Sequence, residues 1–403
     1  MSTQDQRAHL FFLILLSLAH GIIDLSGGAV VALLPTIRSQ FTLSYTMVGA
    51  FMLFSNLASS LTQPVFGLMS DRSNQRWLLP FSLFLGGIGL AAIGWMPAFW
   101  LVVAAAIVNS MGTASFHPEG GHAAHNLAGT QRARAMAIYG VGGNIGYALG
   151  PLYAGLLLAL GAGTKGTVWA LVLPGLLALI IIRLLPRWQR LEHVAASHAP
   201  AKADLPETSW RGTVLLTAAT VVRSVINSGI LTYIPFFWID KLGHAAGSAR
   251  YIQVMYLIAG VGGTLLGAPI ADRIGARRLL ILSFALLLPL HIVLPFLTGW
   301  ALLAVLFVAG FVVVSTFTTT LVLTQEYMPR SPGLASGLNL GLASGLGGIG
   351  VMFLGMIADH WGVVAVLEAI AALVPVALLL TTLLPKIPAH TVSARELPSP
   401  ADD

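Results

Sequence analysis

Long stretches without charge constrain this chain more than any other feature. Charged residues make up 9% of it and apolar residues 56%, whereas about a quarter of a soluble domain is charged. A helix needs about 20 apolar residues to cross a bilayer. Twelve apolar runs of this chain are long enough to do so. We therefore predict an all-α polytopic membrane protein with twelve spans, near 9–35, 46–69, 77–95, 98–121, 133–160, 166–186, 211–239, 250–271, 279–297, 300–326, 333–358 and 362–385.

A short charged loop occurs twice, half a chain apart. Each copy lies between two apolar runs, at 67–76 and at 267–278. Its charged residues keep an offset of 201 (272 minus 71) in a chain of 403: Asp71, Arg72 and Arg76, then Asp272, Arg273 and Arg277. This duplication indicates two pseudo-symmetric bundles of six helices each.

One long polar segment separates the predicted bundles. We expect an N-terminal bundle over 1–186, a cytoplasmic linker over 187–210 containing Pro200 and Pro206, a C-terminal bundle over 211–385 and a cytoplasmic tail over 386–403. A cytoplasmic N-terminus places 16 of the 21 Lys and Arg residues on that side, as the positive-inside rule requires. This placement explains the basic pI of 9.8 without nucleic acid as a partner.

The first predicted span carries two ionisable residues, His20 and Asp24. Four residues apart, they share one face of a helix. An ionisable group at membrane depth costs about 2.5–3.5 kcal/mol on insertion scales, so it usually faces a cavity or a partner. A carboxylate beside an imidazole suits proton carrying. A structural hydrogen bond to a neighbouring helix is the alternative.

The fourth predicted span contains a second polar group, Ser-Phe-His-Pro-Glu-Gly-Gly-His at 115–122. Pro118 removes a backbone donor, and we expect it to break the helix where His117 and Glu119 face a cavity. A helix cap is the main alternative. A metal site formed by His117, Glu119, His122 and His125 is not favoured, because proline disrupts their common face and the chain has no cysteine. We predict neither metal nor cofactor.

The seventh predicted span carries a deep cation, Arg223, about 18 Å from its start. Asn227 follows on the same face and Tyr233 lies further along. The guanidinium could bind an anionic substrate group in two parallel hydrogen bonds. Alternatively, it could pair with Asp24 or Glu119, or only hold helices together.

The two loops resemble the Gly-x-x-x-Asp-Arg-x-Gly-x-Arg-Arg motif of the major facilitator superfamily. The resemblance implies two bundles around a central cavity lined by helices one, four, seven and ten, with the loops gating the cytoplasmic side. His20, Asp24 and Phe-His-Pro-Glu at 116–119 further resemble the fosmidomycin resistance branch, which consists of bacterial proton-coupled drug exporters. The superfamily's usual helix-four arginine is replaced by Val108.

Together these features assign functional roles to three groups of residues. Proton coupling is predicted for His20, Asp24, His117 and Glu119. Substrate binding is predicted for Tyr139, Asn144, Arg223, Asn227, Tyr233, Thr316 and Thr320. The gate is predicted to comprise Gly67, Asp71, Arg72, Arg76, Asp272, Arg273, Arg277 and, on helix five, Gly150 and Pro151.

The favoured interpretation is a monomeric, proton-coupled transporter of the bacterial inner membrane, with both termini cytoplasmic. It would export a drug or small organic compound, and Arg223 favours an anionic, phosphonate-like one. Uptake of a small organic anion is the first alternative. An intramembrane enzyme using His117 and Glu119 is the second, although we predict no enzyme activity. An ATP-driven pump is not indicated, since no phosphate-binding Gly-x-x-x-x-Gly-Lys-Ser/Thr loop occurs.

Overall fold

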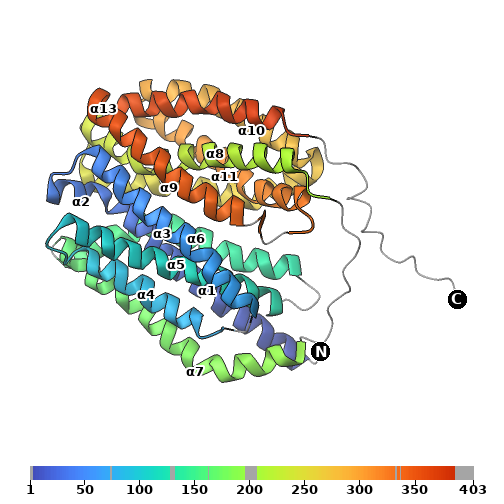
Figure 1. Ribbon diagram of the computed structural model, residues 1–403. Coiled ribbons are helices and arrows are strands. Elements are labelled where there is room, and N and C mark those ends of the chain that lie inside the picture. The colour runs from blue at the N-terminus through green and yellow to red at the C-terminus, as the bar shows by residue number, and fades with distance from the viewer. Residues whose placement is uncertain are drawn as a thin grey trace.

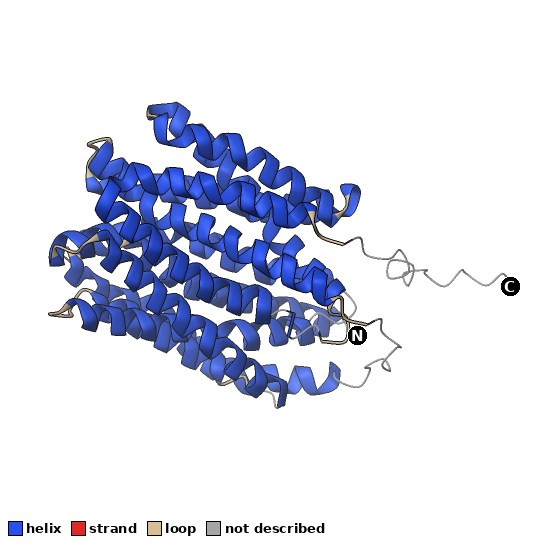
Figure 2. Ribbon diagram, turned by 45° about the horizontal axis from the view of Figure 1, so that its top comes forward, coloured by secondary structure: helices blue, strands red, loops and turns tan. Residues whose placement is uncertain are grey.

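The computed structural model describes residues 3–72, 75–127, 132–161, 163–195, 207–331, 334–335 and 337–385, and these contain helices and loops but no strand (Figure 2). The first half, residues 3–195, contains α1 Thr3–Ala32, α2 Leu34–Phe41, α3 Tyr45–Arg72, α4 Leu78–Ile93, α5 Phe99–Leu127, α6 Arg132–Leu160, η1 Thr164–Leu171 and α7 Val172–Ala195. The second half, residues 207–385, contains α8 Trp210–Phe236, η2 Phe237–Lys241, η3 Ala246–Ser248, α9 Ala249–Ile274, α10 Ala276–Val293, η4 Leu294–Phe296, α11 Gly299–Tyr327, η5 Gly337–Leu342 and α13 Ala343–Thr382.

The helices account for the predicted spans. Within the described residues, nine helical segments are long and apolar enough to cross a membrane. The last of them contains two predicted spans, which separate at Gly362, where φ is 82°. The 16-residue α4 and the 28-residue α3 supply the remaining two. All twelve predicted spans therefore correspond to helices.

Helix packing repeats between the halves. In the first half α1 packs along α6, and in the second half α8 packs along α13. Small residues permit both contacts: a Cβ at Gly146 would lie 1.9 Å from the Gly21 carbonyl oxygen, and one at Gly347 would lie 2.3 Å from the Ser224 hydroxyl. The glycine-rich segments at 140–155 and 341–350 therefore lie in equivalent helix pairs.

The halves meet along two helix pairs, α3 with α13 and α6 with α9. In Figure 1 the second half lies above the first, and both described chain ends lie at the right-hand side of the bundle. We call the opposite end, where α2 meets the start of α3, the distal end. It contains the α1–α2 turn and the break at Gly362.

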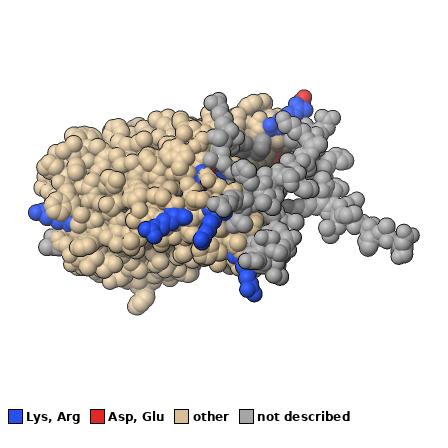
Figure 3. Space-filling view, turned by 90° about the horizontal axis from the view of Figure 1, so that it is seen from below, with Lys and Arg blue, Asp and Glu red and all other residues tan. Residues whose placement is uncertain are grey.

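The surface is consistent with a lipid environment. Large apolar side chains are exposed, among them Trp300 at 86% and Leu61 at 71%. On the face shown in Figure 3 the surface is mostly uncharged, and most of the Lys and Arg side chains lie toward the end that carries the termini. In the described part of the chain, apolar residues therefore cover the sides of the bundle.

One local prediction is wrong. The helix does not break at Pro118, because α5 runs without interruption from Phe99 to Leu127. Proline removes only one backbone donor, and a helix packed among others in a membrane tolerates that loss. His117 and Glu119 consequently project from one continuous helix in different directions.

Candidate functional site

Three ionisable side chains meet between α1 and α5. Asp24 lies at the centre: its Oδ2 is 3.2 Å from His20 Nε2 and its Oδ1 is 3.3 Å from His117 Nε2. The His117 side chain is 33% exposed and the Asp24 side chain 15% exposed. The group is thus enclosed but can still exchange protons with its surroundings. We call His20, Asp24 and His117 the carboxylate–histidine cluster.

Aromatic residues and a glycine fix the position of His20. Its ring stacks on Tyr139 of α6 with centroids 4.1 Å apart, and Phe116 of α5 stacks at 5.9 Å. Gly143 lies directly against the pair, since a Cβ there would be 2.4 Å from His20 Nε2 and 2.7 Å from Asp24 Oδ2. The close packing of α1 on α6 therefore shapes the site.

The hydrogen bonds define where a proton must lie. His20 Nδ1 is 2.8 Å from the Tyr139 carbonyl oxygen, which can only accept, so Nδ1 is the donor. In a neutral His20, Nε2 would then carry a lone pair facing Asp24 Oδ2, and the two acceptors would repel each other. The contact becomes attractive when a further proton sits on either atom. The cluster thus provides a specific position for an exchangeable proton.

Glu119 contacts a different part of the molecule. Its carboxylate accepts hydrogen bonds from Ser70 near the end of α3 and from Arg76 in the following loop. Both Glu119 and Arg76 side chains are completely buried. Neither of these bonds involves the carboxylate–histidine cluster. Its bonds instead connect α5 to the first of the two repeated loops.

The metal set considered from the sequence does not assemble. His117 bonds to Asp24, while Glu119 bonds to Ser70 and Arg76. Among the described residues, the His, Asp and Glu donors near enough to share an ion are those of the carboxylate–histidine cluster, within 4.8 Å of one another. The structure therefore brings together a different set of donors from the one considered from the sequence.

Arg223 is the central feature of a second site, in α8. It is 6% exposed, and its Nε has no hydrogen-bond partner. Its guanidinium carbon lies 5.3 Å from the centre of the Phe317 ring in α11, and Phe317 itself is 40% exposed. No described carboxylate forms an ion pair with Arg223; in particular, Asp24 and Glu119 have other partners. The predicted pairing of Arg223 with either acid is absent from this structure.

Of the other residues predicted to bind substrate, some lie near Arg223 and others do not. Asn227 accepts a 3.0 Å hydrogen bond from Tyr256 of α9, near Arg223. Tyr233 lies instead at the contact between the halves, where its hydroxyl donates to the Val351 carbonyl. Thr316 and Thr320 donate to carbonyls of their own helix. Tyr139 has a buried hydroxyl without a partner and Asn144 is half-buried.

The predicted gate is only partly described. Asp71 and Arg72 end α3, but their side chains lie outside the described part of the structure. Asp272 and Arg273 are exposed at the end of α9. Arg277 donates to the Thr382 carbonyl oxygen. Gly150, followed by Pro151, packs against the backbone of α1, where a Cβ would lie 2.5 Å from Gly28 Cα.

Several contact residues were not identified from the sequence. Gly143, Tyr256 and Phe317 are apolar or small residues within apolar runs, so no local pattern marks them. Ser70 lies within the first charged loop, directly before Asp71. No local pattern marks Ser70 either, because its partner Glu119 is buried on another helix.

Comparison with known proteins agrees with the fold. Residues 16–350 match the profile of the Major Facilitator Superfamily. The fosmidomycin resistance protein of Escherichia coli K12 is 32% identical over 389 residues, covering 95% of each chain. YfnC of Bacillus subtilis, an uncharacterised transporter of this type, is 33% identical and covers 93% of this chain and 92% of its own. A bacterial homologue of the human lysosomal transporter Spinster, crystallised inward-facing and occupied, superposes with a TM-score of 0.75 at 16% identity, over 99% of this chain and all of that one.

Proposed function

Because the chain belongs to the Major Facilitator Superfamily, we propose that it is a proton-coupled secondary transporter that exports a small organic anion. Membership makes it a multi-pass membrane transporter of small molecules and not an enzyme. Proton coupling, the anionic substrate and the outward direction are the proposed steps. We further propose a monomer in the bacterial inner membrane, with cytoplasmic termini and the bundle boundaries given above.

Proton coupling is supported by the carboxylate–histidine cluster. The contact between His20 Nε2 and Asp24 Oδ2 is attractive only when one of the two atoms carries a proton. Loss of that proton leaves two acceptors of α1 facing each other. Because Asp24 also contacts His117 of α5 and His20 also bonds to the Tyr139 carbonyl of α6, we expect the contacts of α1 with both helices to depend on the protonation state. A proton bound in one orientation and released in the other can therefore drive the exchange of states. In this arrangement Asp24 carries the proton, and His20 and His117 position it.

An anionic substrate is supported by Arg223. A buried guanidinium without a described carboxylate partner is an unbalanced positive charge at membrane depth. An anion would balance it through two parallel hydrogen bonds. The Phe317 ring beside it is 40% exposed, so the site borders the molecular surface on that side. A carboxylate or phosphonate group on a small organic molecule fits this chemistry.

The outward direction is supported by the relative from E. coli, which is named for resistance to fosmidomycin. A membrane transporter lowers the internal concentration of a toxic compound by exporting it. We propose fosmidomycin as the first compound to test. In this scheme the two repeated loops close the cytoplasmic side, and Glu119 holds the first loop through Arg76.

Asp24→Asn is the direct test of coupling. In inverted membrane vesicles, an imposed proton gradient should drive uptake of labelled fosmidomycin by the parent protein. The variant should lose accumulation against a gradient, because the amide cannot release a proton, yet it should retain exchange of labelled for unlabelled compound. Equal loss of binding and exchange would make Asp24 a ligand contact or a structural residue.

Gly143→Ala should impair transport without altering any ionisable group. The added methyl would lie 2.4 Å from His20 Nε2 and separate it from Asp24. We expect gradient-driven uptake to fall about tenfold, since a charged hydrogen bond contributes about 1.5–3 kcal/mol. Gly140→Ala on the same helix is the matched control, because a Cβ there meets nothing within 4 Å. Equal uptake by both variants would contradict the role of Gly143.

A further inference from the structure

Tyr45, the first residue of α3, contacts the second half of the molecule through every polar group it has. Its hydroxyl donates to Asp240 Oδ2 at 2.5 Å, and its backbone N–H donates to Asp359 Oδ1 at 2.7 Å. Its carbonyl oxygen lies 3.4 Å from the Tyr233 hydroxyl. The three partners come from η2, α13 and α8. One residue of the first half thus donates hydrogen bonds to two elements of the second and lies close to a third, α8, whose Tyr233 hydroxyl donates to Val351.

Arg38 of α2 reinforces this contact. Its guanidinium carbon lies 4.0 Å above the Tyr45 ring, and its Nη1 is 3.0 Å from Asp240 Oδ2. One carboxylate oxygen of Asp240 therefore accepts from both Arg38 and Tyr45. The Arg38 and Asp240 side chains are 28% and 32% exposed, so water can replace these bonds when they break.

Asp359 stabilises the start of α3 from the opposite half. Besides the Tyr45 N–H, it accepts from the backbone N–H of Thr46 at 2.8 Å and from the Thr46 hydroxyl. The first N–H groups of a helix have no partner within that helix, and the helix dipole favours an anion there. α13 supplies that anion to α3 only while the two halves are in contact.

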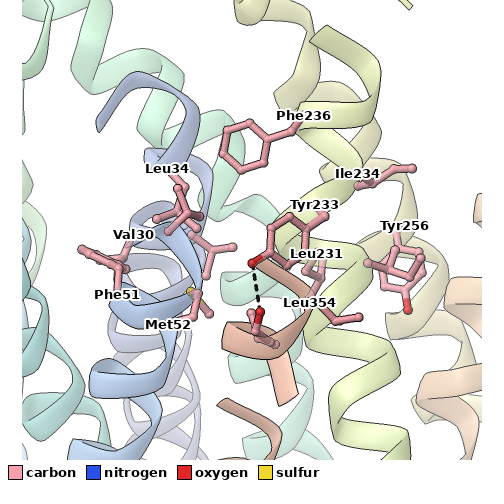
Figure 4. Close-up of a cluster of buried hydrophobic side chains, with 14 of the residues drawn as sticks. Val30, Leu34, Phe51, Met52, Leu231, Tyr233, Ile234, Phe236, Tyr256 and Leu354 are labelled. Carbon is pink, nitrogen blue, oxygen red and sulfur yellow. Dashed lines mark hydrogen bonds between the residues drawn. The ribbon is translucent and has the colours of Figure 1, made fainter. Parts of the chain in front are cut away.

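An apolar seal lies beneath these bonds. Figure 4 shows Tyr233 and Phe236 of α8 facing Val30, Leu34 and Met52 of the first half. Phe236 is 1% exposed and its ring meets the edge of Tyr45 at 5.5 Å. The backbones approach closely as well, because a Cβ at Gly355 would lie 2.4 Å from the Tyr45 carbonyl oxygen. The distal end is therefore closed in this structure.

We propose that Arg38, Tyr45, Asp240 and Asp359 form a distal latch, with Tyr45 as the residue that couples its parts. The latch holds the distal end closed in this state and must separate when that end opens. Its hydrogen bonds and its ion pair join the two halves, and the contact of Arg38 with the Tyr45 ring holds both residues in place. When one half rocks away from the other, these bonds between the halves break together. Each bond is polar and near solvent, so the latch can open without burying an unpaired group.

The test measures the separation of the halves and needs no substrate. The chain has no cysteine, so spin labels can be attached at Gln40→Cys and Ala245→Cys, two exposed positions on either side of the distal end. We expect a main short-distance population in the parent protein. Tyr45→Phe removes only the bond to Asp240, and Arg38→Ala removes the ion pair. Each should raise the ratio of long to short distances roughly fivefold, the equivalent of about one hydrogen bond.

Two controls make the result specific. Tyr153→Phe removes a hydroxyl that has no partner in the structure, so it should leave the distances unchanged. The double variant Arg38→Asp with Asp240→Arg exchanges the two charges and can form the ion pair again. Its distance distribution should therefore be closer to that of the parent than the distribution of either single variant. Parent-like distances in both Tyr45→Phe and Arg38→Ala would overturn the latch. So would an equal shift in Tyr153→Phe.

Discussion

A Glu119→Ala variant is expected to unfold about 3–5 kcal/mol more readily than the parent, the usual cost of breaking a buried ion pair. Arg76 and Glu119 are both completely buried. Removing the carboxylate leaves the Arg76 guanidinium without this counter-charge, and it also deprives Ser70 of its acceptor. Thermal unfolding of the detergent-solubilised protein, followed by loss of the monodisperse peak after heating, measures the change.

Two further variants distinguish the effect of losing the Glu119 charge from the effect of losing its packing. Glu119→Leu should be nearly as unstable as Glu119→Ala, because it removes the same counter-charge from Arg76. Arg76→Met combined with Glu119→Leu should be more stable than Glu119→Leu alone, since removing both members of a buried pair costs less than removing one. If Glu119→Ala melts like the parent protein and loses gradient-driven transport instead, Glu119 carries a proton, as the sequence first suggested.

The spans and the repeat could be predicted from the sequence because both are local or periodic. Apolar runs of about 20 residues specify membrane helices directly. The i, i+4 spacing of His20 and Asp24 placed them on one face, and the structure has them 3.2 Å apart. The glycines at 140–155 are small enough for close helix packing, and α6, which contains them, does lie against α1. These features depend on helix geometry alone.

The partners of single charges could not be predicted, because they come from distant segments. Glu119 lies two residues after His117, yet the two bond to different helices. Arg38 and Asp240 are 202 residues apart, and neither spacing nor composition connects them. Tyr45 and Asp240 lie at the ends of apolar runs, where polar residues are common. Only the packing of the two halves gives these residues a role.

The largest effect on ligand binding is expected at Arg223. Arg223→Ala should weaken binding of an anionic ligand about a hundredfold, since hydrogen bonds to charged groups contribute about 1.5–3 kcal/mol each and about 2.7 kcal/mol corresponds to that factor. Arg223→Lys keeps the charge but loses the planar fork, so about a tenfold loss is expected. Fosmidomycin titrated into purified protein, with an uncharged analogue of similar size as control, measures both.

Stability distinguishes this site from the Arg76–Glu119 pair. Arg223 has no described carboxylate within ion-pair distance, so Arg223→Ala strands no acid and removes a buried, incompletely bonded cation. The melting temperature without ligand should therefore stay the same or rise, while ligand-induced stabilisation disappears. A lower melting temperature without ligand would show that Arg223 holds the helices together. If the variant keeps its stability and still binds the anion as tightly as the parent, the guanidinium does not contact the substrate, and the anionic class loses its main support.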